Sequence, residues 1–189
     1  MPVVKDKNIL DNINTKKLAV ETGTHLGDGV QRLLELGFEH VISIEIEQGH
    51  YNISKNRFIN NSSVEIVHAD SVSYLKENCK NFPNGVFISL DGHYSGGSTG
   101  FFKEKVPLLS ELETILVEFK HEDIMIVIDD VGCWNKENTF DKNSSEWESW
   151  SGIEEKSILE VVRRFDFDVK SMYDENKISF ILMLKRKTQ

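Results

Sequence analysis

The chain has 189 residues, the usual length of one domain, and we expect a single domain over residues 1–189. Hydrophobic residues make up 39% of the sequence, which is enough for a packed core and excludes wholesale disorder. The 22 Lys and Arg residues and 31 Asp and Glu residues give a formal net charge of −9, so we expect no binding to nucleic acid or to membrane surfaces.

The sequence shows no signal for export or for membrane insertion. No apolar run reaches the roughly 18–20 residues of a membrane span, and the N-terminal segment lacks the apolar core of a signal peptide. Two cysteines, Cys79 and Cys133, make no disulfide framework. We therefore expect a soluble, cytoplasmic protein, with a homodimer as the common oligomeric default.

Short apolar runs alternate with amphipathic segments along the chain. The first run, 17–21, is followed by a glycine-bearing turn and by apolar residues at helical spacing up to Gly37. Further strands are expected over 40–45, 64–70, 85–91, 124–130, 167–173 and 178–184. Further helices are expected over 47–59, 71–80, 107–119 and 153–165. Residues 134–152 are polar, acidic and tryptophan-bearing, and are expected to form a long loop, which we interpret as a lid with aromatic walls. The alternative is that one or two of its tryptophans, Trp134, Trp147 and Trp150, pack the loop onto the core.

This order of elements predicts an α/β fold. Five successive βα units imply a mostly parallel sheet with helices on both faces, and the last two strands imply an antiparallel hairpin. We therefore expect a Rossmann-like, doubly wound sheet of seven strands that ends in a C-terminal antiparallel hairpin.

Acidic residues follow each of the first five predicted strands: Glu21, Glu45, Asp70, Asp91, and Asp129 with Asp130. The carboxyl ends of parallel strands meet at one edge of a sheet, which is where such folds bind ligands. Like charges that crowd together there repel one another unless a cation or a hydrogen-bonding ligand offsets them. The alternative for any one position is that the acid caps the helix that follows.

The turn after the first strand predicts a nucleoside-binding site. Gly23, Gly27 and Gly29 allow a close approach of the backbone to a ligand, although their spacing is not that of the dinucleotide fingerprint. Glu45 lies 22 residues after Gly23, near the ~20 expected for an acid that binds ribose hydroxyls. Together, the turn and the acid favour a ligand of the adenosine type.

A second group of residues predicts a metal site. Asp91, Asp129 and Asp130 follow neighbouring strands, and three hard oxygen ligands suit Mg²⁺, Mn²⁺ or Ca²⁺. His93 lies two residues beyond Asp91 and has a side chain suited to general-base catalysis. The alternatives are a helix cap with solvated acids, and a histidine that is simply exposed.

On these residues the chain resembles the class I S-adenosylmethionine-dependent methyltransferases, over residues 15–187. Their sheet has five parallel βα units closed by a C-terminal antiparallel hairpin, the order expected here. The resemblance implies S-adenosylmethionine as cofactor and assigns its contacts to Glu21, Gly23, Thr24 and Gly27 for the methionine part, to Glu45 for the ribose, and to Asp70 and Ser71 for the adenine.

Within this family, the metal-dependent O-methyltransferases of the catechol and macrocin types look nearest. They carry one acid after the fourth strand and two metal-binding residues after the fifth, where Asp91, Asp129 and Asp130 stand here. The resemblance therefore implies methylation of a hydroxyl on a small molecule or sugar, assisted by a divalent metal such as Mg²⁺. Asp91 and His93 are the expected catalytic residues, with His93 as the base.

Two alternatives stay open. One is a non-catalytic protein that binds S-adenosylmethionine, which the combination of three acids and His93 disfavours. The other is a nicotinamide-dependent oxidoreductase, which the glycine spacing and the terminal hairpin disfavour. The sequence does not identify the methyl acceptor, the need for a metal, or the roles of residues 93–105 and 134–152.

Overall fold

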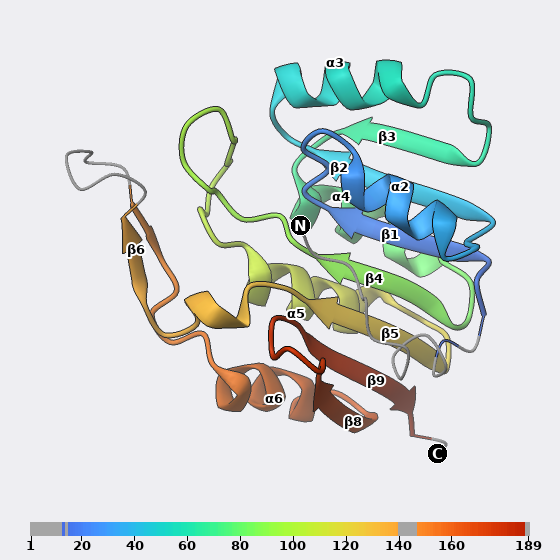
Figure 1. Ribbon diagram of the computed structural model, residues 1–189. Coiled ribbons are helices and arrows are strands. Elements are labelled where there is room, and N and C mark those ends of the chain that lie inside the picture. The colour runs from blue at the N-terminus through green and yellow to red at the C-terminus, as the bar shows by residue number, and fades with distance from the viewer. Residues whose placement is uncertain (1–12, 14, 140–146, 188–189) are drawn as a thin grey trace.

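The computed structural model describes residue 13 and residues 15–139 and 147–187 (Figure 1). Seven strands form one sheet in the order β3-β2-β1-β4-β5-β9-β8. They are β1 (Leu18–Thr22), β2 (His40–Glu45), β3 (Val64–His68), β4 (Val86–Leu90), β5 (Asp123–Ile128), β8 (Phe167–Tyr173) and β9 (Phe180–Arg186). β1 to β5 pair in parallel, and β9 pairs antiparallel with both β5 and β8. This topology confirms the predicted Rossmann-like sheet with its C-terminal hairpin.

Helices cover both faces of the sheet because successive residues of each strand point to opposite sides. Val20 and Ile88 pack in a core with α4 (Ser71–Asn78), α5 (Leu108–Glu118) and α6 (Glu155–Arg163). Their neighbours Ala19 and Phe87 pack in a second core with α2 (Asp28–Glu35) and with Phe58, which follows α3 (Gln48–Arg57). None of the described helices is long and apolar enough to span a membrane.

The segment after β5 differs from the expected long loop. A short 3₁₀ helix, η2 (Val131–Cys133), is followed by a two-stranded antiparallel sheet of β6 (Glu137–Thr139) and β7 (Trp147–Ser149). Apart from Trp147, these strands carry polar residues that give no alternating pattern, so their backbone pairing could not be predicted from hydrophobicity. The residues between them lie outside the described part of the chain.

The interpretation of this segment as an aromatic-walled lid is wrong for two of its three tryptophans. Trp134 and Trp150 are buried in the main core, where Trp134 packs edge-on against Phe180. Large indole rings bury more apolar area in a core than at a mobile surface, which explains this placement. The side chain of Trp147 is not among those that the structure describes.

Candidate functional site

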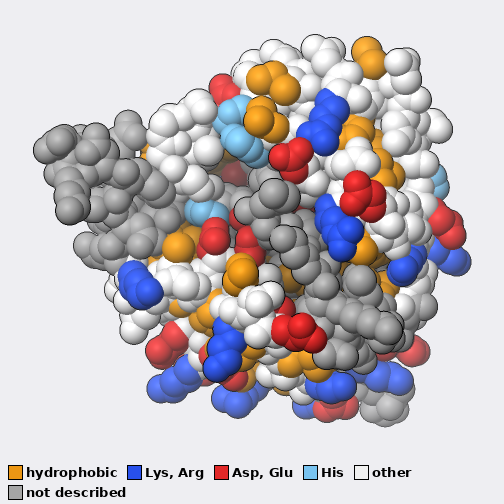
Figure 2. Space-filling view, in the orientation of Figure 1, with side chains coloured by type: hydrophobic (Ala, Val, Ile, Leu, Met, Phe, Trp, Pro, Cys, Tyr) orange, Lys and Arg blue, Asp and Glu red, His pale blue; other side chains and the backbone are white. Residues whose placement is uncertain are grey.

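A cavity of about 350 Å³ opens at the edge of the sheet where β1, β2, β4 and β5 end. In Figure 1 the segments after β4 and β5 project from this edge, and Figure 2 shows histidine and acidic side chains beside one another on the same face of the molecule. Of the eleven predicted site residues, ten line the cavity: Glu21, Gly23, Thr24, Glu45, Asp70, Ser71, Asp91, His93, Asp129 and Asp130. Gly27 is the exception and caps the start of α2.

The turn after β1 is fixed by glycine. Gly23 has a φ of 83°, and a Cβ atom there would lie 2.3 Å from the carbonyl oxygen of Asp91. Its N–H donates to the carbonyl of Ile44, 2.9 Å away on β2. Gly27 has a φ of 85° and packs against the ring of Phe58. These glycines let the first turn lie directly against the ends of β2 and β4, which places the turn in the cavity wall.

Glu21 is buried beneath this turn. Its Oε2 accepts a hydrogen bond from the hydroxyl of Ser43 at 2.6 Å, and Ser43 lies 2.7 Å from the hydroxyl of Thr24. Burial raises the pKa of Glu21 to about 8, an effect to which the charge of Glu45 adds and which the bond to Ser43 opposes. Glu21 is therefore linked through Ser43 to the turn, and its pKa depends partly on the charge of Glu45 in the cavity wall.

Glu45 is held firmly at the cavity wall. Its Oε2 accepts from the backbone N–H of His25 at 2.7 Å, and its Oε1 accepts from the N–H of Glu47 at 2.8 Å. The residue is only 6% exposed. Each carboxylate oxygen keeps a further lone pair for a donor such as a ribose hydroxyl.

Asp70 combines both roles that were considered for the strand-end acids. Its side chain accepts from the N–H of Ser73 at 2.9 Å and so caps α4, while the residue also lines the cavity. Ser71, the first residue of α4, lies beside it and lines the same cavity. The wall of the cavity is thus continuous from β2 to the start of α4.

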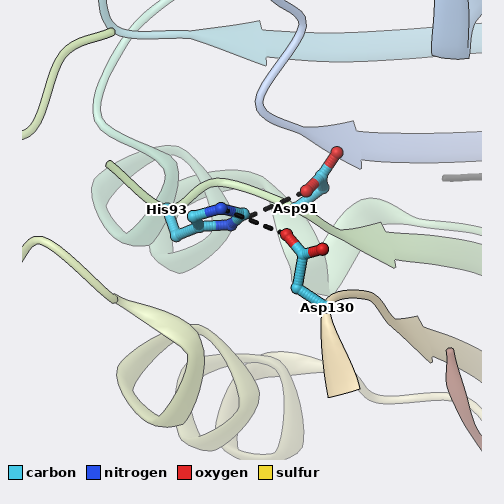
Figure 3. Close-up of side chains that lie close together, drawn as sticks. All are labelled: Asp91, His93 and Asp130. Atoms are coloured by element: carbon cyan, nitrogen blue, oxygen red, sulfur yellow. Dashed lines mark ion pairs between the residues drawn. The ribbon is translucent and has the colours of Figure 1, made fainter. Parts of the chain in front are cut away.

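Asp91, His93 and Asp130 form a compact cluster (Figure 3). One ligand atom from each lies within 4.8 Å of the other two. His93 Nδ1 is 3.7 Å from Asp91 Oδ1, and His93 Nε2 is 3.1 Å from Asp130 Oδ2. The hydroxyl of Ser95 lies 2.9 Å from the same Nε2. Burial, followed by the charges of Asp129 and Asp130, raises the pKa of Asp91 well above its usual range.

Asp129 is placed differently from its neighbour. Its Oδ1 accepts from the hydroxyl of Ser179 at 3.1 Å, and it falls outside the three-residue cluster found among the described residues. Asp130 adopts a left-handed backbone conformation with a φ of 55°, which is uncommon for a residue other than glycine. Burial and the charge of Asp130 raise the pKa of Asp129.

Three further residues at the site were not predicted. His25 and His50 line the cavity with their ring centroids 4.4 Å apart, and His50 Nε2 lies 3.3 Å from the hydroxyl of Ser98. Glu111 is buried in α5 behind the cavity. A signal for Glu111 was available, because an acid between Leu108, Leu112 and Ile115 lies on the apolar face of its helix.

The sequence matches no protein-family model and no curated protein. Solved structures are nevertheless similar to it. A methyltransferase from Podospora anserina, bound to S-adenosylhomocysteine, shares 14% identity over 91% of this chain and 72% of its own, with a TM-score of 0.59. The chain has the fold of the S-adenosylmethionine-dependent methyltransferases.

Two other structures support this assignment of the methyltransferase fold. A SAM-dependent methyltransferase from Archaeoglobus fulgidus shares 14% identity over 95% of this chain and 90% of its own, with a TM-score of 0.58. An rRNA methylase from Streptococcus thermophilus shares 13% identity over 96% of this chain and 93% of its own, with a TM-score of 0.54. At such identities the similarity establishes the fold, and the chemistry has to be argued from the site.

Proposed function

We propose that this chain is an S-adenosylmethionine-dependent methyltransferase that methylates a hydroxyl group of a small molecule or sugar with the help of a divalent cation, Mg²⁺ in the first instance. The observation that carries the proposal is the position of the Asp91–His93–Asp130 cluster. It lines the same cavity as the turn after β1, at the carboxyl edge of a methyltransferase-type sheet.

The cavity suits a cationic nucleoside cofactor. Gly23 leaves the backbone of the first turn open to close approach, and Glu45 offers fixed carboxylate oxygens to ribose hydroxyls. Asp70 and Ser71 line the same cavity, and we assign them to the adenine. Carboxylates along the wall favour the positively charged sulfonium over the neutral product, which promotes product release.

The cluster also suits a hard divalent cation. Asp91 and Asp130 supply carboxylate oxygens, and Asp129 adds a third carboxylate at the cavity wall. Burial, followed by repulsion from Asp129 and Asp130, raises the pKa of Asp91, and a bound cation would offset both effects. When bound, S-adenosylmethionine supplies the methyl group and the cation lowers the pKa of the acceptor hydroxyl.

His93 is the proposed base. With cofactor and acceptor bound, a ring nitrogen of His93 would accept the hydroxyl proton as the methyl group passes from the sulfonium, which would leave as the thioether, to the acceptor oxygen. Asp130, 3.1 Å from Nε2, orients the ring and stabilises its protonated form.

The charge of the cavity supports an acceptor without phosphate groups. Among the described residues that line it, eight are acidic and none is Lys or Arg: Glu21, Asp28, Glu45, Asp70, Asp91, Glu104, Asp129 and Asp130. A phosphate backbone would be repelled there, since nucleic-acid binding depends on clustered cations. Phe101 and Phe102 line the mouth and are 49% and 59% exposed, so they offer apolar contacts to a small acceptor.

The double substitution Asp129→Asn with Asp130→Asn tests the metal in this proposal. It removes two carboxylates and keeps the side-chain volumes, so we expect methyl transfer to a panel of phenols and sugars to be abolished. Affinity for S-adenosylhomocysteine should change only a few-fold. Glu122→Gln with Asp123→Asn, at the opposite end of β5, is the matched control. Methyl transfer that survives in EDTA would refute the requirement for a divalent cation. Binding of S-adenosylhomocysteine without any methyl transfer would favour a non-catalytic protein.

A further inference from the structure

A second, much smaller cavity lies directly behind the candidate site. Its volume is about 10 Å³, which is the space that one water molecule needs. Residues from the ends of β4 and β5, from α5 and from the segment after β7 line it. Asp91, His93 and Asp129 line this small cavity as well as the large one, so the two share a wall.

Two buried polar atoms belong to residues that line the small cavity. Glu111 Oε1 and Trp150 Nε1 have no hydrogen-bond partner within the described part of the chain, although the residues are only 1% and 2% exposed. A buried polar atom without a partner costs about 1–3 kcal/mol, so such atoms normally bond to protein or to water. An indole N–H is a donor and a carboxyl oxygen is an acceptor, and a single water can satisfy both.

Glu111 also contacts the chain that leads from β4 into the candidate site. Gly92 fits against it closely, because a Cβ there would lie 2.9 Å from Glu111 Oε1 and 3.0 Å from the hydroxyl oxygen of Thr22. The hydroxyl of Thr22 lies on the same side of Gly92 as Glu111 and accepts a hydrogen bond from the N–H of Asp91 at 3.2 Å. Glu111 therefore supports the backbone between Asp91 and His93 from below.

Trp150 contacts the same segment through the side chain of His93. Its ring meets the imidazole of His93 edge-on, with centroids 5.1 Å apart. A link between Trp150 and Glu111 would thus fix both the backbone that carries His93 and the ring of His93 itself.

We propose that the small cavity binds one water molecule between Glu111 and Trp150, and that Glu111 is thereby a positioning residue for Asp91 and His93. The water site rests on the small cavity and on the two unpartnered buried atoms of residues that line it. Its effect on catalysis rests on the proposed function, in which His93 accepts the acceptor proton.

A high-resolution crystal structure of the full chain tests the water site without any assay of activity. We expect density for one water within hydrogen-bonding distance of Glu111 Oε1 and Trp150 Nε1. A dry cavity, or side chains of Glu111 and Trp150 turned toward other partners, would overturn the proposal. The structure of Glu111→Leu should lack the water and show a displaced His93 ring, and an unmoved ring would remove the positioning role.

Methyl-transfer kinetics test the positioning role separately. Glu111→Leu should lower kcat by roughly 10²-fold, the cost of a misplacement of about 1 Å, and change S-adenosylhomocysteine affinity only a few-fold. Glu111→Gln keeps an oxygen that can accept from the water and should restore most of kcat. Ile115→Val, a small change in the same helix and core, is the control for general destabilisation. Equal losses in kcat for Glu111→Leu and Ile115→Val would refute the positioning role of Glu111. A wild-type chain without methyl transfer would refute the proposed function instead, and the crystal structure would then still test the water site.

Discussion

At the scale of single residues, His93 gathers most of the contacts at the candidate site. Its two ring nitrogens lie near Asp91, Asp130 and Ser95, and its ring face meets Trp150. Its side chain is 11% exposed, so it reaches the large cavity while remaining fixed by its neighbours. This combination of access and orientation is what a general base needs.

Replacement of His93 by Ala should therefore lower kcat by about 10²–10⁴-fold, the usual contribution of a positioned base. The loss should shrink as the pH is raised and the acceptor hydroxyl ionises without help. His121→Ala, on the chain just before β5 and at the opposite edge of the sheet, serves as the control. Steady-state kinetics across pH check this, and an unchanged rate for His93→Ala would exclude the role of base.

Glu21 makes a testable contribution to stability because its pKa is raised from 4.5 to about 8. The folded chain keeps the Glu21 proton at pH values where the unfolded chain has already lost it. The unfolded state then binds fewer protons, so the free energy of unfolding falls as pH rises through this window, by at most about 1.4 kcal/mol per pH unit.

Urea unfolding of the wild type and of Glu21→Gln between about pH 5 and pH 8 measures this term. We expect the decline in stability to be shallower in Glu21→Gln, since an amide does not titrate. Glu39→Gln, at an exposed position before β2, should retain the wild-type slope. Parallel pH profiles for wild type and Glu21→Gln would contradict the assignment of this slope to Glu21.

At the scale of elements, the site depends on close contact between the ends of neighbouring strands. The turn after β1 touches the end of β4 through Gly23, whose positive φ and lack of a side chain are both required.

Gly23→Ala should therefore lower the free energy of unfolding by more than about 1 kcal/mol. It should also weaken cofactor binding, because Asp91 must move. Thermal and chemical unfolding check the first effect, with Gly132→Ala, which has open space around it, as control. Equal stability of the two variants would show that the turn tolerates a side chain.

The elements that could be predicted are those whose apolar pattern is set by burial. β4 and β5 are buried along almost their whole length, and their sequences are correspondingly continuous apolar runs. β6 and β7 pair through their backbones in a polar segment, so no such pattern existed to reveal them. Glu111 was visible as an acid on an apolar helix face, but its neighbour Gly92 comes from a separate segment of the chain, after β4.

The sequence predicts where the candidate site lies more readily than it predicts which side chains contact one another there. Strand-end acids reveal the functional edge because parallel strands bring their carboxyl ends together. Which acid meets His93 depends on the local backbone path at the end of β5, where Asp130 has a positive φ that its residue type does not determine. The sequence therefore treated Asp129 and Asp130 as equivalent, whereas the structure places Asp130 with His93 and bonds Asp129 to Ser179.

At the scale of the whole molecule, the acidic residues behind the net charge of −9 are unevenly distributed. Eight of the acids line one cavity, whose described lining residues include no Lys or Arg, although Arg57 pairs with one of the eight, Asp28, from outside the lining. A cationic cofactor and a divalent cation would relieve that repulsion, so the same charges that raise the pKa of Asp91 in the free protein would favour the bound state. The overall acidity is thus part of the proposed site, and it disfavours phosphate-rich acceptors.

Isothermal titration calorimetry with S-adenosylhomocysteine tests the central claim most directly. We predict one binding site per chain, and a loss of about 1.5–3 kcal/mol of binding free energy in Glu45→Ala, where charged hydrogen bonds to ribose are removed. Glu39→Ala should bind as the wild type does, and NAD should give no heat. Binding of NAD without binding of S-adenosylhomocysteine would contradict the proposal that this cavity serves methyl transfer.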